Sequence, residues 1–138
     1  MVSAIVYRAA CECGKVTLTA RGEPGAVVAC HCEACQRRTG SPLGVAAYFD
    51  LSDVEYKGET RAYARAAQEG RSLTQHFCTT CGGVVYFFAD KHANGIGVPI
   101  GMFADPKFPP PVRSVWEQSR HEWLDVPGVS HHVRGRET

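Results

Sequence analysis

Seven cysteines in three tight clusters constrain the fold of this 138-residue chain more than any other feature. The clusters are a C-x-C pair at Cys11 and Cys13, a C-H-C-x-x-C triplet at Cys30, Cys32 and Cys35, and a C-x-x-C pair at Cys78 and Cys81. An odd number of cysteines would leave one thiol over in a closed disulfide framework. The N-terminus has no basic segment followed by a long apolar run, so we expect no secretion signal and a reducing, cytoplasmic location. Metal binding is therefore the natural role for these thiols.

The spacing of the cysteines divides them into a set of four and a set of three. A separation of two or three residues lets a tight turn direct both sulfurs at one metal ion, about 2.3 Å from zinc. Structural zinc sites have four tetrahedral ligands, whereas catalytic sites have three protein ligands and an open position. We therefore predict two zinc ions per chain, with a closed site at Cys11, Cys13, Cys78 and Cys81 and an open site at Cys30, Cys32 and Cys35.

Spacing alone leaves other interpretations of the triplet open. The triplet could hold a second structural zinc that a histidine completes, or two of its cysteines could form a disulfide. His31 lies inside the triplet, but its neighbours are already ligands, so we expect it beside the site or toward solvent. We expect His76 to be structural. The other histidines have no partner at ligand spacing, and they are His92, His121, His131 and His132.

Frequent turn residues separate short segments that are rich in β-branched and aromatic side chains, and this pattern predicts a mainly β fold of short antiparallel strands. The clearest strand candidates are Lys15–Ala20, Val45–Phe49, Gly83–Phe88 and Ile96–Phe103. Little helix is expected, limited to single turns at Gln36–Gly40 and within Val115–Leu124. We expect a single domain over residues 1–138, with a core at roughly residues 5–126 and a frayed polar tail at residues 130–138.

The charge distribution argues against two classes of partner. The formal net charge is +1, and the only tight basic groupings are Arg37-Arg38 and the pair Arg134 and Arg136, which make no basic stripe for a nucleic acid. No segment approaches the roughly 20 apolar residues that a membrane-spanning helix requires. We therefore expect neither a nucleic-acid partner nor a membrane partner.

The order of the motifs matches a known pattern. A C-x-C-G motif at Cys11 is followed by the C-H-C-x-x-C motif with Arg37, Thr39, Gly40, Ser41 and Pro42, and then by an F-C-x-x-C-G motif at Cys78. Later matches are Gly101–Asp105, Val115-Trp116 and Trp123-Leu124. Together these motifs resemble the glutathione-dependent formaldehyde-activating (GFA) family, whose domain centromere protein V shares, over roughly residues 5–126.

This resemblance implies a small β-tent of sheets pinned by zinc. It also implies a closed zinc site at the four-cysteine set and a labile, catalytic-type zinc at Cys30, Cys32 and Cys35. Members of the family are assigned as carbon–sulfur lyases that join glutathione to formaldehyde as S-hydroxymethylglutathione. The expected partner is therefore a small-molecule thiol, with glutathione as the first candidate. Arg37 and Arg38 could bind a glutathione carboxylate because guanidinium matches carboxylate geometry, although a solvated turn is the simpler interpretation.

A function of another class stays open beside the lyase. The chain could be a zinc-stabilised binding or scaffold module without catalysis, and ligand exchange at the triplet zinc would distinguish the two. A methionine sulfoxide reductase is set aside, because that chemistry needs a nucleophilic cysteine outside the metal sites. All seven cysteines are already assigned to metal.

Overall fold

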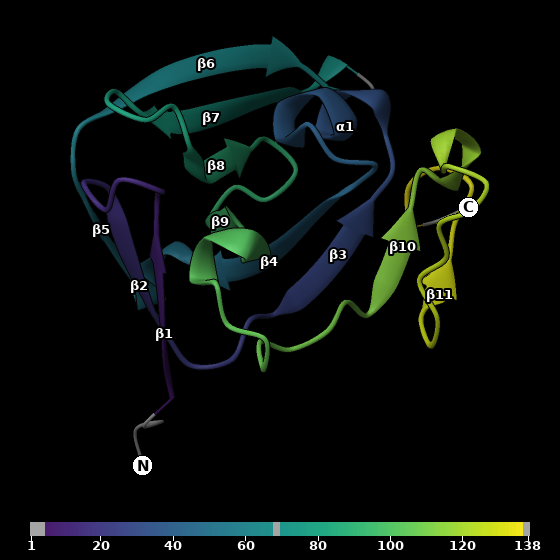
Figure 1. Cartoon of the computed structure of the whole chain (residues 1–138), viewed down its shortest axis with the longest axis horizontal. Helices are drawn as coiled ribbons and strands as arrows, with labels where there is room; N and C mark the ends of the chain where they lie inside the picture. Colours follow the sequence, from purple (N-terminus) through teal and green to yellow (C-terminus); the bar gives the residue numbers. More distant parts are fainter. Residues whose placement is uncertain (1–4, 68–69, 137–138) are drawn as a thin grey trace. The chain divides into compact units, whose positions relative to one another are not determined.

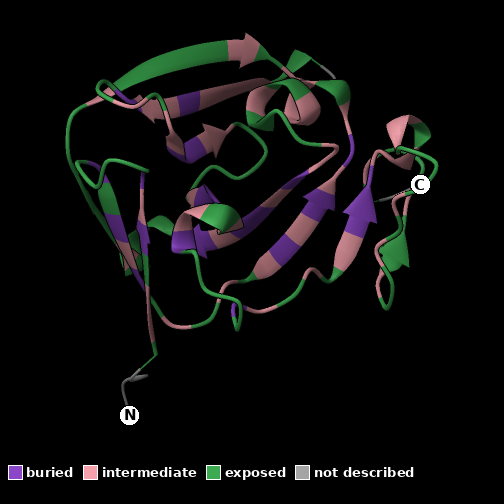
Figure 2. Ribbon diagram, viewed as in Figure 1, coloured by how far each residue is buried: buried purple, intermediate pink, exposed green. Residues whose placement is uncertain are grey.

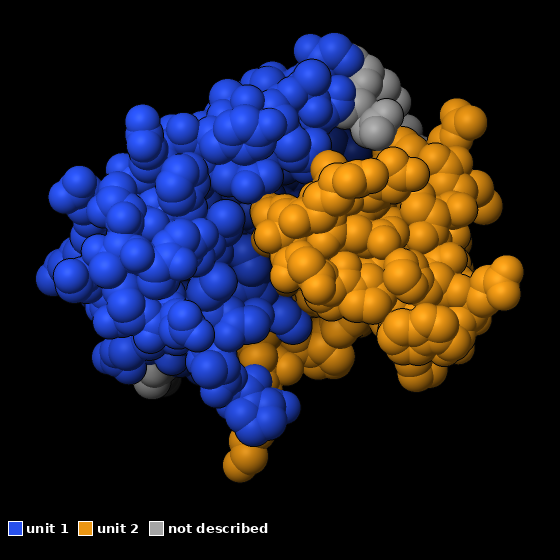
Figure 3. All heavy atoms as spheres, turned by 45° about the horizontal axis from the view of Figure 1, so that its top comes forward, with its two compact units in different colours: residues 1–25, 47–106 blue, residues 26–46, 107–138 orange. Residues whose placement is uncertain are grey.

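The computed structural model describes residues 5–67 and 70–136 of the chain (Figure 1). Contacts divide the chain into two compact units, which Figure 3 colours separately. Unit 1 consists of Met1–Gly25 and Ala47–Pro106, and unit 2 consists of Ala26–Ala46 and Lys107–Thr138. Each unit is therefore built from two separate segments of the chain. The four-cysteine set lies in unit 1, and the triplet lies in unit 2.

A three-stranded antiparallel sheet in unit 1 has the order β1 (Val6–Ala10), β2 (Thr17–Arg21) and β5 (Val54–Lys57). Leu18 and Ala20 of β2 are buried and alternate with more accessible neighbours, as expected for a strand with one face on the core. The loop from β1 to β2 carries Cys11 and Cys13, and the Cys11 N–H closes it by donating to the Val16 carbonyl at 3.0 Å. The turn between two core strands therefore presents the first cysteine pair.

Four further strands of unit 1 pair as antiparallel neighbours in chain order: β6 (Thr60–Ala66), β7 (Ser72–Cys78), β8 (Val84–Ala89) and β9 (Gly95–Pro99). Their most buried side chains include Val85, Ile96 and Val98. Figure 2 shows buried segments on β8 and β9. Gly97 faces Phe87, and a Cβ at position 97 would lie 2.3 Å from the Phe87 ring. Glycine is therefore required where this ring packs onto the backbone of β9.

Unit 2 contains β3 (Ala26–Cys30), α1 (Glu33–Thr39), β10 (Arg113–Val115) and β11 (Ser130–His131), and β4 (Gly44–Asp50) begins in unit 2 and ends in unit 1. β10 pairs with β3 and with β11, and it runs parallel to both. This corrects the expectation of antiparallel strands, which holds for the strand pairs of unit 1 given above. Residues 31–112 and 116–129 connect these strands, and parallel neighbours need such long connections.

The C-terminal residues also differ from the expectation of a frayed tail. Ser130 and His131 form β11, and the Trp116 N–H donates to the Arg134 carbonyl at 2.7 Å. The polar composition of this segment suggested fraying, but these hydrogen bonds use backbone groups, which every residue type other than proline can supply as donors. Residues 137–138 of the predicted tail lie outside the described residues.

The prediction of a mainly β chain with little helix is confirmed, since α1 is the one α-helix among the described residues. It begins earlier than the predicted turn because Cys32 caps it: the Cys32 sulfur accepts from the Cys35 N–H at 3.3 Å. Gly40 ends it in the left-handed conformation, at φ 67°. The described 3₁₀ turns include η1 (Leu51–Asp53), η3 (Ile100–Phe103) and η4 (Glu117–Ser119). The predicted strand Ile96–Phe103 therefore ends at Pro99 and continues as η3.

Candidate metal centres

The four cysteines predicted to form a closed metal site lie together in unit 1. The sulfur atoms of Cys11, Cys13, Cys78 and Cys81 all lie within 4.8 Å of one another. The Cys13 sulfur is 3.6 Å from the sulfur of Cys11 and 3.6 Å from that of Cys78. A tetrahedral zinc with Zn–S bonds of about 2.3 Å places its sulfurs about 3.8 Å apart. The cluster is therefore compatible with a zinc ion bound by four thiolates.

Two tight turns direct these sulfurs toward one point. In the first turn, the Val16 N–H donates to the Cys11 sulfur at 3.3 Å. In the second, the Thr80 N–H donates to the Cys78 sulfur at 3.3 Å, and the Gly82 N–H donates to the Cys78 carbonyl at 2.9 Å. Gly82 has a φ of 80°, in the left-handed region that glycine adopts at little cost. Backbone donors to sulfur favour its charged form, which is the form that binds metal.

These donors change the ionisation of the thiols. Backbone hydrogen bonds from Cys81 and Thr80 lower the pKa of Cys78 to about 6. The pKa of Cys13 rises to about 11, because desolvation and hydrogen bonds with the neighbouring thiols outweigh a backbone hydrogen bond from Lys15 that lowers it. Thiols in such close contact oppose each other's ionisation, and a bound cation would stabilise all four thiolates.

The three remaining cysteines lie together in unit 2, around the start of α1. Cys30 ends β3, Cys32 caps α1, and Cys35 lies in the first turn of the helix. Their sulfurs all lie within 4.8 Å of one another, and no fourth cysteine, histidine or carboxylate among the described residues joins the group. None of the seven cysteines, all within the described residues, forms a disulfide. The geometry therefore favours a three-ligand site over the histidine-completed and disulfide alternatives.

Crowding makes the triplet hard to ionise without a cation. Hydrogen bonds with Cys32 and Cys35, together with burial, raise the pKa of Cys30. The hydrogen bond with Cys30 lowers the pKa of Cys35, but the hydrogen bond with Cys32 and burial outweigh it, so the net shift is upward. The positive charge of Arg38 acts to lower the pKa of Cys35. A metal ion would supply a larger positive charge at the same place.

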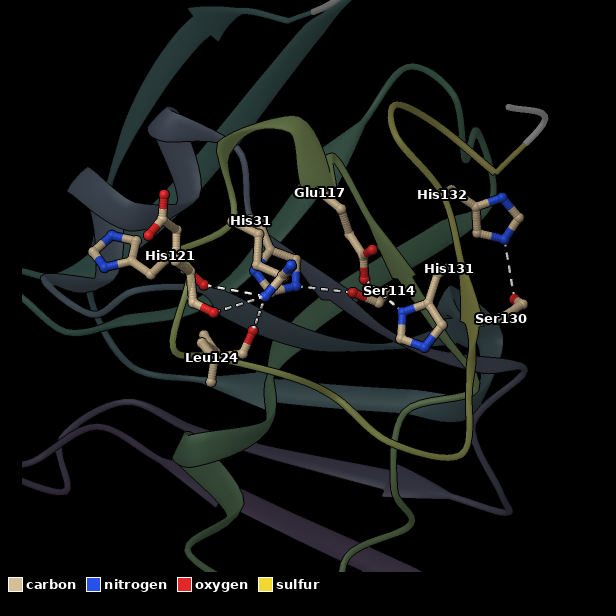
Figure 4. Close-up of polar contacts among 10 residues, drawn as sticks. His31, Ser114, Glu117, His121, Leu124, Ser130, His131 and His132 are labelled. Carbon is tan, nitrogen blue, oxygen red and sulfur yellow. Dashed lines mark hydrogen bonds and ion pairs between the residues drawn. The ribbon is translucent and has the colours of Figure 1, made fainter.

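His31, between two triplet cysteines in sequence, is buried rather than directed to solvent. Its Nε2 lies 2.8 Å from the Ser114 hydroxyl (Figure 4), and burial lowers the His31 pKa, which favours the neutral ring. The serine hydroxyl can donate or accept in this contact, and the tautomer of the His31 ring sets which of the two it does. The His31 Nδ1 has no hydrogen-bond partner among the described residues. His31 therefore supports the cysteine loop from the interior of unit 2.

Gln36 shows no signal in the sequence, yet its side chain links three parts of this site. Its Nε2 donates to the His31 carbonyl at 2.9 Å and to the Ser119 carbonyl at 3.1 Å. Its Oε1 lies 2.9 Å from the His121 Nε2. Two of these partners are more than 80 positions away along the chain, so no local pattern could indicate the contacts. Gln36 therefore ties α1 to the cysteine loop, to the end of η4 and to the segment that follows it.

Arg37 and Arg38, predicted together as carboxylate-binding residues, differ in their surroundings. Both lie in the last turn of α1, but Arg37 is exposed and Arg38 is half-buried. A Cβ at Gly44 would lie 2.7 Å from the Arg38 Nη2 and 3.3 Å from the Cys35 Cβ. The absence of a side chain at Gly44 therefore leaves the space that the Arg38 guanidinium occupies near the triplet. Of the two arginines, Arg38 is the better placed to contact a ligand there.

Two comparisons with known proteins give matches. The sequence pattern of the family described as "Glutathione-dependent formaldehyde-activating enzyme" matches residues 6–119, a range that includes all seven cysteines. A crystal structure of a Rhodobacter sphaeroides protein has a similar fold, with a TM-score of 0.57 and 20% sequence identity over 91% of this chain and 98% of that one. Among curated proteins, none matches the chain. No helix in the described ranges is long and apolar enough to cross a membrane.

Proposed function

Because the chain belongs to the glutathione-dependent formaldehyde-activating enzyme family, we propose that it is a zinc-dependent carbon–sulfur lyase. Its substrates would be glutathione or a related small thiol, and the formaldehyde adduct S-hydroxymethylglutathione. The observation that carries this proposal is the group of three cysteine sulfurs that no fourth protein ligand joins in the described part of the chain. We propose one structural zinc at the four-cysteine set and one catalytic-type zinc at the triplet.

The triplet is the proposed reaction centre. A zinc ion held by Cys30, Cys32 and Cys35 would offer one exchangeable position that favours the thiolate form of an incoming thiol. The proposed reaction joins the thiol sulfur to the carbon of formaldehyde, and the thiol proton ends on the former carbonyl oxygen. The reverse reaction breaks the same C–S bond. The chain keeps the three sulfurs at the start of α1 through the Cys32 cap and the hydrogen bond from Gln36 to the His31 carbonyl.

We further propose that the two units act as one domain over residues 1–138 in a reducing, cytoplasmic location. The family match runs over residues 6–119 and therefore includes segments of both units. Metal-binding cysteines must stay reduced, and a reducing compartment keeps them so. We expect no nucleic-acid or membrane partner in this role.

Exchange NMR of formaldehyde with glutathione tests the proposed reaction. Hemithioacetal formation is already fast in water, so the measurement must separate catalysis from background. The expected result is an exchange rate that rises in proportion to the protein concentration. A rate that the protein leaves unchanged would overturn the lyase proposal and favour the alternative, a non-catalytic zinc-stabilised binding or scaffold module.

Arg38→Ala is expected to raise the KM for glutathione about tenfold with little change in kcat, since a charge-assisted hydrogen bond contributes roughly 1.5–3 kcal/mol. Arg37→Ala is the matched control, because Arg37 has the same chemistry in the same helical turn but is exposed. We expect its KM to stay within about twofold of the wild-type value. Steady-state kinetics on both variants check this, and equal effects of the two substitutions would contradict the assignment of Arg38.

A further inference from the structure

Residues 130–134 form a C-terminal strap along residues 112–118 of unit 2. Backbone hydrogen bonds join the two segments, each from the N–H of one residue to the carbonyl of another. The donor and acceptor pairs are Ser130 and Val112, His132 and Ser114, Trp116 and Arg134, Glu117 and His132, and Gln118 and Val133. Their lengths run from 2.7 to 3.4 Å. The family match ends at residue 119, so it does not include the strap. The strap is therefore a feature of this chain that the family match does not explain.

Ser114 connects the strap to the cysteine loop. Its carbonyl accepts from the His132 N–H of the strap at 2.9 Å, while its hydroxyl lies 2.8 Å from the His31 Nε2. Both Ser114 and His31 have an exposed fraction of 0%, so neither can shift without disturbing the other. The backbone N–H of His31 also donates to the Val115 carbonyl at 3.0 Å. A displacement of β10 would therefore move the loop that carries Cys30 and Cys32.

Glu117 connects a side chain of the strap to the surroundings of Ser114 and His31. Its Oε2 lies 2.7 Å from the His131 Nδ1, and Figure 4 shows both residues on the Ser114 side of the His31 ring. Burial raises the pKa of Glu117, but the hydrogen bond with His131 and the polar group of the neighbouring Ser114 outweigh this and hold the pKa below its ordinary value. The carboxylate therefore favours its charged form, and the His131 ring of the strap contacts it directly.

The turn that brings Glu117 to this position is strained. Trp116 has a φ of 57°, and a bulky side chain in this left-handed region is uncommon. Surrounding structure must hold such a residue in place. The Trp116 N–H donates to the Arg134 carbonyl at 2.7 Å, so the strap supplies one of the contacts that hold it.

We propose that the C-terminal strap positions the three-cysteine centre, acting through Ser114 and Glu117 on His31. The strap residues are positioning residues, because they act on the cysteines only through the buried ring and backbone of His31. The proposal depends on the proposed metal binding at the triplet, but it does not depend on the proposed lyase activity.

Zinc release to an excess of a chromophoric chelator tests this role. Two phases are expected, a fast phase from the triplet and a slow phase from the four-cysteine set. Ser114→Ala should accelerate the fast phase roughly tenfold, since partners that orient metal-binding residues typically contribute 10–100-fold to affinity. His131→Ala should accelerate it about threefold, and His131→Gln should restore it because the amide can still donate to Glu117. The slow phase should not change in any variant.

His132→Ala is the matched control, because the His132 ring bonds the Ser130 hydroxyl inside the strap. Its fast phase should match the wild type. A fast phase unchanged in both Ser114→Ala and His131→Ala would overturn the proposal, as would equal acceleration of both phases in both variants. If Ser114→Ala fails to fold, the comparison of His131→Ala with His131→Gln still tests the proposal. The His131 side chain is 44% exposed and therefore tolerates replacement.

The same assay separates the strap from the lyase. A protein that shows both zinc phases and the predicted variant effects, but no catalysed thiol exchange, would overturn the lyase proposal and support the strap. Release of only one zinc ion per chain from the wild-type protein, in the slow phase, would overturn both, because the triplet would then hold no metal.

Discussion

Cys78→Ser is expected to prevent unit 1 from folding, the largest effect predicted for a single substitution. Cys78 is buried at the end of β7, and its sulfur lies within 4.8 Å of three other sulfurs. Structural zinc contributes an apparent free energy of about 10–16 kcal/mol in small zinc domains, whereas whole domains have a net stability of about 5–15 kcal/mol. A hydroxyl does not replace the thiolate, so most of the net stability is lost. Circular dichroism should show no cooperative thermal transition.

Cys35→Ser is the matched control for this experiment. It makes the same chemical change at a half-buried cysteine in unit 2, in the other set. This variant should keep a β-type spectrum and a cooperative transition within a few degrees of the wild type. A Cys78→Ser variant that melts as well as Cys35→Ser would contradict the structural role of the four-cysteine set.

The Cys35→Ser variant itself is expected to lose one of two zinc ions and to reduce thiol–formaldehyde exchange to the background rate. Two thiolates and a hydroxyl hold zinc more weakly than three thiolates do, and without the metal the triplet loses the position that would bind an incoming thiolate. Elemental analysis and exchange NMR should be made on the same preparation. Undiminished catalysis by a protein with one zinc per chain would show that the triplet is not the reaction centre.

The cysteine clusters could be predicted from sequence because the members of each pair and of the triplet are close along the chain. A turn of two to four residues brings their sulfurs together, and the ligand number of zinc then divides seven cysteines into four and three. The ligand number of zinc also predicted that the Cys13 pair and the Cys78 pair share one site. Cys13 and Cys78 are 65 positions apart in the sequence, and their sulfurs lie 3.6 Å apart. The mainly β character was predictable for a similar reason, since alternation and turn residues are local signals.

The surroundings of the triplet could not be predicted, because they depend on contacts without local pattern. Ser114 reaches His31 across 83 positions, and β10, which carries Ser114, has only three residues and too little alternation to recognise. The parallel pairing of β10 depends on the path of long connections rather than on its own sequence. The polar tail suggested fraying, because composition does not report the backbone hydrogen bonds that hold residues 130–134.

Cadmium-113 NMR of the cadmium-substituted protein tests most directly whether the triplet accepts a small thiol at an open fourth position. Cadmium replaces zinc at soft thiolate sites, and its chemical shift depends on the number of bound sulfurs. Two resonances are expected, one from each cysteine set. Addition of glutathione should move the triplet resonance toward that of the four-sulfur site and leave the other unchanged. Two resonances that both stay in place at saturating glutathione would contradict the proposed function.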